Sequence, residues 1–101
     1  MPDLLSEAAG MAIESLGPGT ILDVTTCNTR YRVVVLDGEG RAVISGGPHF
    51  QEPTEVRIEG STTTEWEFRA GWIGVGLRLG MTRGPRTITT SPIRSVVPVA
   101  A

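Results

Sequence analysis

The chain has 101 residues, a formal net charge of -2 and 40% hydrophobic residues, which fits one folded domain over residues 1–101 and excludes a disordered chain. A single cysteine, Cys27, excludes an intrachain disulfide, and no stretch is long and apolar enough to predict a membrane-spanning helix. The first residues also lack the basic flank and apolar run of a secretion signal, so we expect a cytoplasmic protein.

The first predicted element is a short helix. Apolar residues recur at intervals of three and four over residues 4–16, which is typical of an amphipathic helix. Gly17, Pro18 and Gly19 end it, because glycine accepts the left-handed helix ending and proline cannot continue the hydrogen-bond ladder. About three helical turns are marginally stable alone, so we expect this helix to pack against the rest of the chain.

Residues 20–99 are predicted to form strands. The chain contains ten Val, seven Ile and twelve Thr, and β-branched side chains favour strands. Turn residues interrupt the apolar runs every eight to twelve positions, which is typical of a barrel or sandwich. The predicted strands cover residues 20–26, 30–36, 41–45, 72–79, 86–90 and 93–99, with loops at residues 46–53 and 80–85.

Residues 54–69 show the clearest alternation. Val56, Ile58, Trp66 and Phe68 occupy even positions, and charged residues occupy the odd positions 55, 57, 59, 65, 67 and 69. This pattern predicts one buried face and one face in solvent. Residues 60–64 then form either a hairpin turn or a bend in one long strand, and we favour the hairpin.

Together these elements predict a mostly β fold, a small and strongly bent antiparallel barrel of five to seven strands over residues 20–99 with a short N-terminal helix. This element order resembles that of the Sm-like small barrels, which assemble into rings, often on RNA. The stretch Ile58-Glu59-Gly60-Ser61 is only loosely similar to an Ile-Arg-Gly-Asn motif of that family, because Glu59 stands where an arginine belongs. The resemblance therefore implies an architecture, and no RNA-binding residue.

Two further stretches are similar to those of short uncharacterised bacterial proteins. They are Gly71-Trp72-Ile73-Gly74-Val75-Gly76 and Thr89-Thr90-Ser91-Pro92-Ile93-Arg94. This similarity implies a bacterial source and no activity.

No pattern in the sequence predicts a catalytic residue, a metal site or a cofactor. The one histidine, His49, follows a turn sequence, so a small enzyme that uses His49 is kept only as an alternative function. One histidine, one cysteine and scattered carboxylates lack the spacing of metal ligands. The glycines at positions 71, 74, 76 and 80 lack the lysine and helix of a phosphate-binding loop, and strand curvature explains them better.

Charge is distributed unevenly along the chain. All eleven acidic residues precede residue 68, whereas residues 68–101 carry five arginines and no acid. We expect an interaction surface in this last third, formed by Trp72, Gly74, Gly76, Arg78, Arg83, Arg86 and Arg94. The leading hypothesis is a non-enzymatic binding or assembly module, in which the acidic part of one copy meets the arginine-rich part of another in a homo-oligomer. The alternative partner is single-stranded RNA or another nucleic acid, although a pI near 5.3 and 5% aromatic residues disfavour it.

Overall fold

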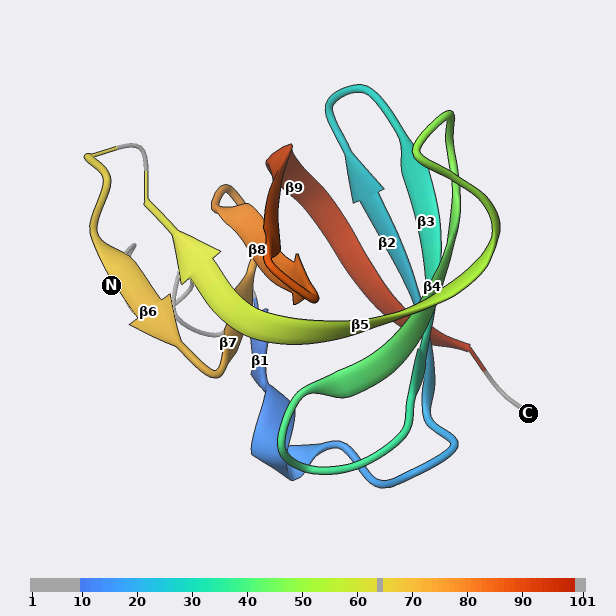
Figure 1. Ribbon diagram of the computed structural model, residues 1–101. Coiled ribbons are helices and arrows are strands. Elements are labelled where there is room, and N and C mark those ends of the chain that lie inside the picture. The colour runs from blue at the N-terminus through green and yellow to red at the C-terminus, as the bar shows by residue number, and fades with distance from the viewer. Residues whose placement is uncertain (1–9, 64, 100–101) are drawn as a thin grey trace.

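The computed structural model describes residues 10–63 and 65–99 of the chain, which form nine strands and one turn of 3₁₀ helix (Figure 1). The elements in chain order are β1 (Gly10–Ala12), η1 (Ile13–Ser15), β2 (Ile21–Thr26), β3 (Arg30–Val35), β4 (Arg41–Gly46), β5 (Phe50–Thr62), β6 (Phe68–Ala70), β7 (Trp72–Gly74), β8 (Arg78–Arg83) and β9 (Arg86–Val99). The fold is thus mostly β, as the sequence predicts.

Six of these strands form a closed ring of antiparallel pairs. The circuit runs β2–β3–β4–β5–β8–β9 and returns to β2. The two longest strands close it, because each pairs with different neighbours along its length. β5 runs across the molecule from β4 to β8 and β6, and β9 runs from β8 to β2 (Figure 1). Register shifts in these pairings mark bulges, which let long strands bend.

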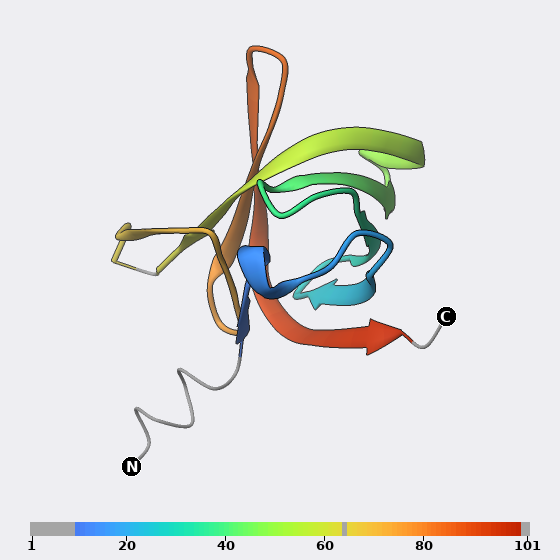
Figure 2. The same ribbon diagram turned by 90° about the horizontal axis from the view of Figure 1, so that it is seen from below.

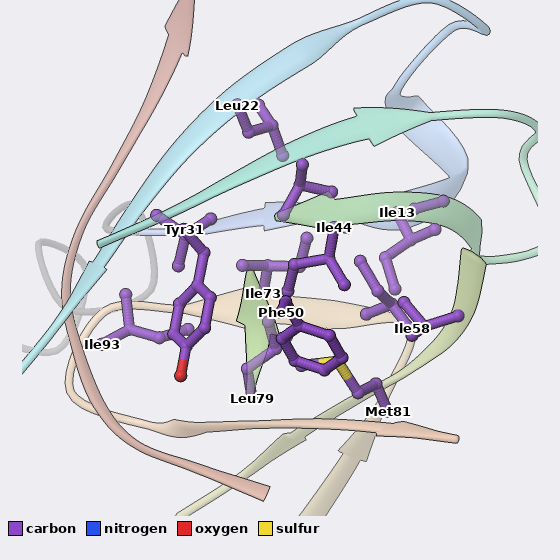
Figure 3. Packing of buried hydrophobic residues seen from close by; sticks show 14 residues of the cluster. Ile13, Leu22, Tyr31, Ile44, Phe50, Ile58, Ile73, Leu79, Met81 and Ile93 are labelled. Atoms are coloured by element: carbon purple, nitrogen blue, oxygen red, sulfur yellow. The ribbon is translucent and has the colours of Figure 1, made fainter. Parts of the chain in front are cut away.

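The interior of the ring is apolar. In β2, β3 and β4, alternate residues such as Leu22, Val33 and Ile44 are fully buried, so one face of each strand points inward. Side chains from β5, β7, β8 and β9 complete the cluster (Figure 3). At its border, the rings of Tyr31 and Phe50 meet edge to face with centroids 6.2 Å apart. This aromatic pair lies beside the candidate site described below.

The predicted N-terminal helix is wrong where the structure describes it. Residues 10–12 form β1, paired with β7, and residues 13–15 form η1, while residues 4–9 lie outside the described range. Gly10 pairs with Gly74 in this sheet and lies next to the Trp72 ring. A side chain at position 10 would collide with that ring. Strand pairing and burial of Ile13 therefore override a weak helical periodicity that already contained a glycine.

The alternation over residues 54–69 holds only in its first half. Val56 and Ile58 are buried as predicted, but Trp66 is 73% exposed and Phe68 is 54% exposed. β5 and β6 do form a hairpin, but Gly60, Ser61 and Thr62 are still paired in it, and Thr63 N–H donates a 2.8 Å hydrogen bond to the Glu67 carbonyl beyond them, so the turn comes later than residues 60–64. Trp66 lies in that turn with a φ of 66°, so the parity that buries Ile58 does not continue through it.

The last third of the chain divides differently from the prediction. The expected strand 72–79 is two strands, β7 and β8, separated by a turn at residues 75–77. The expected loop 80–85 is mostly β8, which leaves only Gly84 and Pro85 as a two-residue turn. Residues 86–99 form one strand, because β9 pairs with β8 and then with β2 without interruption. The segment 46–53, expected as a loop, likewise contributes residues 50–53 to β5.

Candidate binding groove

A groove lies beside the β8–β9 hairpin. Figure 2 shows this hairpin standing out from the body of the molecule. β9 is longer than its partner β2. The last backbone hydrogen bond between the two sides joins the N–H of Cys27, the residue after β2, to the Pro92 carbonyl in β9 at 3.0 Å. Among the described residues, the segment of β9 before Pro92 therefore pairs with β8 alone, and its other edge is open. The first part of β5 is likewise paired with β4 only, because its pairing with β8 begins at Arg57.

The groove consists of two hollows that share His49, Ile88 and Thr89. The outer hollow has a volume of about 550 Å³ and is also lined by Phe50, Arg83, Arg86 and Thr87. The inner hollow has a volume of about 330 Å³ and is also lined by Asn28, Thr29, Tyr31, Pro48, Thr90 and Ser91. Volumes of this order suit small-molecule ligands.

The charge of the groove is positive. Arg83 and Arg86 flank the hairpin turn and are exposed, and no described carboxylate lies within 4.0 Å of either guanidinium. None of the residues that line the two hollows is acidic. Both guanidinium groups are therefore available to an anion, which arginine binds with a fork of N–H donors.

The backbone adds donors to the same wall. In a two-residue hairpin the flanking residues, Arg83 and Arg86, form a hydrogen-bonded pair, so alternate residues further along β9 turn their N–H and C=O groups away from β8. These residues are Thr87 and Thr89, and both line the outer hollow. The open edge thus presents backbone N–H groups beside two threonine hydroxyls.

A tyrosine hydroxyl borders the inner hollow. Tyr31 as a residue is only 6% exposed, but its hydroxyl oxygen keeps contact with solvent and forms no hydrogen bond with another described residue. Figure 3 shows the Tyr31 oxygen pointing away from Leu22 and Ile44, at the border of the apolar cluster. The neighbouring Thr90 hydroxyl is already satisfied, because it accepts a hydrogen bond from Leu79 N–H at 3.1 Å and donates one to the Ser91 carbonyl at 2.7 Å. The Tyr31 hydroxyl is therefore a free donor and acceptor at the wall of the inner hollow.

The residues predicted from the sequence do not form one surface. Trp72 and Gly74 lie in β7, which pairs with β1. Gly76 is exposed in the turn that follows β7. Arg78 stacks on Trp66 with 5.6 Å between its guanidinium carbon and the ring centroid, and Arg94 is exposed further along β9. Only Arg83 and Arg86, of the seven, line the groove.

Two other groove residues are not predicted from the sequence as ligand contacts. His49 is kept there only as the catalytic group of an alternative small enzyme, and Tyr31 lies in the strand predicted over residues 30–36 without a feature that marks it. In the sequence, Tyr31 follows a turn at residues 27–29 and His49 lies in a turn at residues 46–49. The two turns line one hollow only because the ring of strands closes. His49 is exposed and has no carboxylate beside it in either hollow, so the orienting group of a catalytic histidine is missing there.

A second, acidic hollow lies beside η1. Its volume is about 360 Å³, and Glu14, Glu39 and Glu59 line it together with Arg57. Glu59 is engaged by its neighbours, since its carboxylate accepts a 2.8 Å hydrogen bond from the Thr82 hydroxyl and lies 4.0 Å from the Arg57 guanidinium. Next to it on the surface, Arg41 binds Glu55 at 3.0 Å, and this hydrogen bond and charge raise the pKa of Arg41.

Neither a metal site nor a membrane helix is found in the described part of the chain. Over residues 10–63 and 65–99, no three His, Cys, Asp or Glu side chains are grouped so that they could hold a metal ion. Within the same ranges, no helix has the length and apolar character needed to cross a bilayer.

Comparison with known proteins gives no relative from which a function could be transferred. No protein family, curated protein or solved structure matches this chain.

Proposed function

We propose that this chain is a non-enzymatic binding or assembly module, and that the groove beside the β8–β9 hairpin is its binding surface for an anionic partner. The proposal rests on two arginines, Arg83 and Arg86, that line the groove and form no ion pair with a described carboxylate, and on the absence of acidic residues from the groove lining. In the same proposal the ring is a small barrel of the Sm-like architecture in a cytoplasmic bacterial protein.

The proposal is tested by titrating two kinds of polyanion, a single-stranded uridine oligonucleotide and poly-glutamate, at low salt with fluorescence anisotropy. Arg83→Glu with Arg86→Glu should weaken binding of the preferred polyanion about tenfold or more, because each charge-assisted hydrogen bond contributes roughly 1.5–3 kcal/mol. Preference for the oligonucleotide would favour nucleic acid as the partner, and preference for poly-glutamate would favour an acidic protein.

A matched control separates the groove from general charge. Arg69→Glu with Arg94→Glu makes the same change in net charge on exposed residues that do not line the groove. This variant should keep at least most of the affinity. Equal losses in both double variants, or no binding of either polyanion to the native chain, would refute the proposed groove function.

The acidic hollow supports homo-oligomerisation as a second function. A projecting hairpin with two arginines and a hollow with three glutamates are complementary, and they lie on different parts of one chain, so they form the two sides of a heterologous contact. By light scattering, the native chain should have a mass above one chain, which falls when Glu14→Arg and Glu39→Arg are combined. Mixing this variant with the Arg83→Glu/Arg86→Glu variant should restore part of the mass. A monomer at every concentration would exclude this contact.

A further inference from the structure

The two hollows of the groove differ in chemistry, and the difference identifies a class of ligand. The outer hollow holds the cationic groups, Arg83 and Arg86, together with His49. Apart from the shared His49, the inner hollow is lined by neutral residues, among them Asn28, Tyr31 and Ser91. A ligand that fills both hollows therefore has an anionic end and a neutral, hydrogen-bonding end.

The anionic end suits a phosphate better than a lone carboxylate. Two arginine forks, the backbone N–H groups at the open edge of β9 and the hydroxyls of Thr87 and Thr89 offer more donors than a carboxylate with two oxygens uses well. A terminal phosphate has three oxygens and up to two negative charges. It matches donors that approach from several directions.

The neutral end suits a hydroxyl-bearing group. The Tyr31 hydroxyl can donate one hydrogen bond and accept another, it lines the inner hollow, and it has no partner among the described residues. The rest of the residue is buried while this oxygen keeps contact with solvent, so a ligand in the inner hollow would replace that water contact with a hydrogen bond from its own hydroxyl. Asn28 and Ser91 line the same hollow and offer further donors and acceptors.

From these two ends we propose that the groove binds a sugar phosphate, with the phosphate in the outer hollow and the sugar hydroxyls against Tyr31 in the inner one. This proposal rests on the proposed groove function and deepens it. The sugar phosphate is either a free small molecule or one unit of a nucleic-acid strand. Both place phosphate oxygens next to a sugar, although the free molecule carries a terminal phosphate of up to two charges and an internal unit of a strand carries a singly charged diester.

The experiment measures the binding of ribose 5-phosphate, inorganic phosphate and a single-stranded uridine oligonucleotide by amide chemical-shift titration. Ribose 5-phosphate should bind the native chain about tenfold more tightly than inorganic phosphate. Tyr31→Phe keeps the aromatic contact with Phe50 and removes only the hydroxyl. It should weaken ribose 5-phosphate binding about three- to tenfold, the usual range for one neutral hydrogen bond, and leave inorganic phosphate binding unchanged.

The oligonucleotide distinguishes the two sources. If only the oligonucleotide shows Tyr31-dependent binding, the sugar phosphate belongs to a strand. If neither ribose 5-phosphate nor the oligonucleotide depends on the Tyr31 hydroxyl, the sugar-phosphate proposal is overturned. The groove function still stands in that case, provided that polyanion binding depends on Arg83 and Arg86.

Discussion

At the scale of single residues, Gly60 is the glycine at which an added Cβ would come closest to another atom. Its φ is 152°, and a Cβ there would collide with the backbone carbonyl oxygen of Arg69. Gly60 pairs with both Ala70 and Gly80, so β6 and β8 approach it from opposite edges. A glycine at this place allows β5 to bend while both neighbours stay close.

Gly60→Ala should therefore lower the free energy of unfolding by about 2 kcal/mol or more, because the positive φ and the backbone contact both oppose a side chain. Urea denaturation followed by circular dichroism measures this change. Gly38→Ala is the matched control, since a Cβ at Gly38 has no neighbour within 4 Å and its φ is not positive. The control should change stability by no more than about 0.5 kcal/mol, and equal losses in the two variants would contradict the role given to Gly60.

At the scale of elements, one buried hydroxyl attaches β7 to the ring. Ser61 in β5 is fully buried, donates a 2.5 Å hydrogen bond to the Trp72 carbonyl and accepts one from Gly74 N–H at 3.2 Å. β7 pairs otherwise with the three-residue strand β1. This side chain thus adds to the link between the short β1–β7 sheet and β5 that the 2.9 Å hydrogen bond from Gly71 N–H to the Glu59 carbonyl and the burial of Ile73 also provide.

Ser61→Ala leaves the buried Gly74 N–H and the partly buried Trp72 carbonyl without that partner, so it should cost about 1–3 kcal/mol of stability. It should also speed hydrogen exchange of the Gly74 amide more than that of amides in β2. Ser95→Ala, where the hydroxyl makes no hydrogen bond with a described residue, should change neither quantity measurably. Unchanged exchange at Gly74 in the Ser61 variant would show that β7 is held by other contacts.

The elements also show which features could be predicted from the sequence. Strands β2, β3 and β4 were predicted within about two residues, because each has one buried face and ends at glycine, asparagine or aspartate turns. The split between β7 and β8 and the continuity of β9 were not predicted, because both depend on which strands lie alongside. The exposure of Trp66 was missed for a similar reason, since it follows from the position of a turn.

At the scale of the whole molecule, the candidate site is a product of ring closure. Arg83 and Arg86 were predicted as interaction residues from the charge distribution alone. Tyr31 and His49 are distant from them in sequence and share the groove because β9 extends beyond β2 while β4 and β5 turn back at residues 47–49. No local pattern encodes that approach, so the groove could not be predicted before the strand order was known.

Anion binding in the groove beside the β8–β9 hairpin can be located by an amide chemical-shift map of the whole chain on addition of inorganic phosphate at low ionic strength. We predict shifts concentrated at His49, Arg86, Thr87 and Thr89, and their loss when Arg83→Glu and Arg86→Glu are combined. Shifts spread evenly over the exposed arginines, or centred on Arg69 and Arg94, would contradict anion binding in the groove.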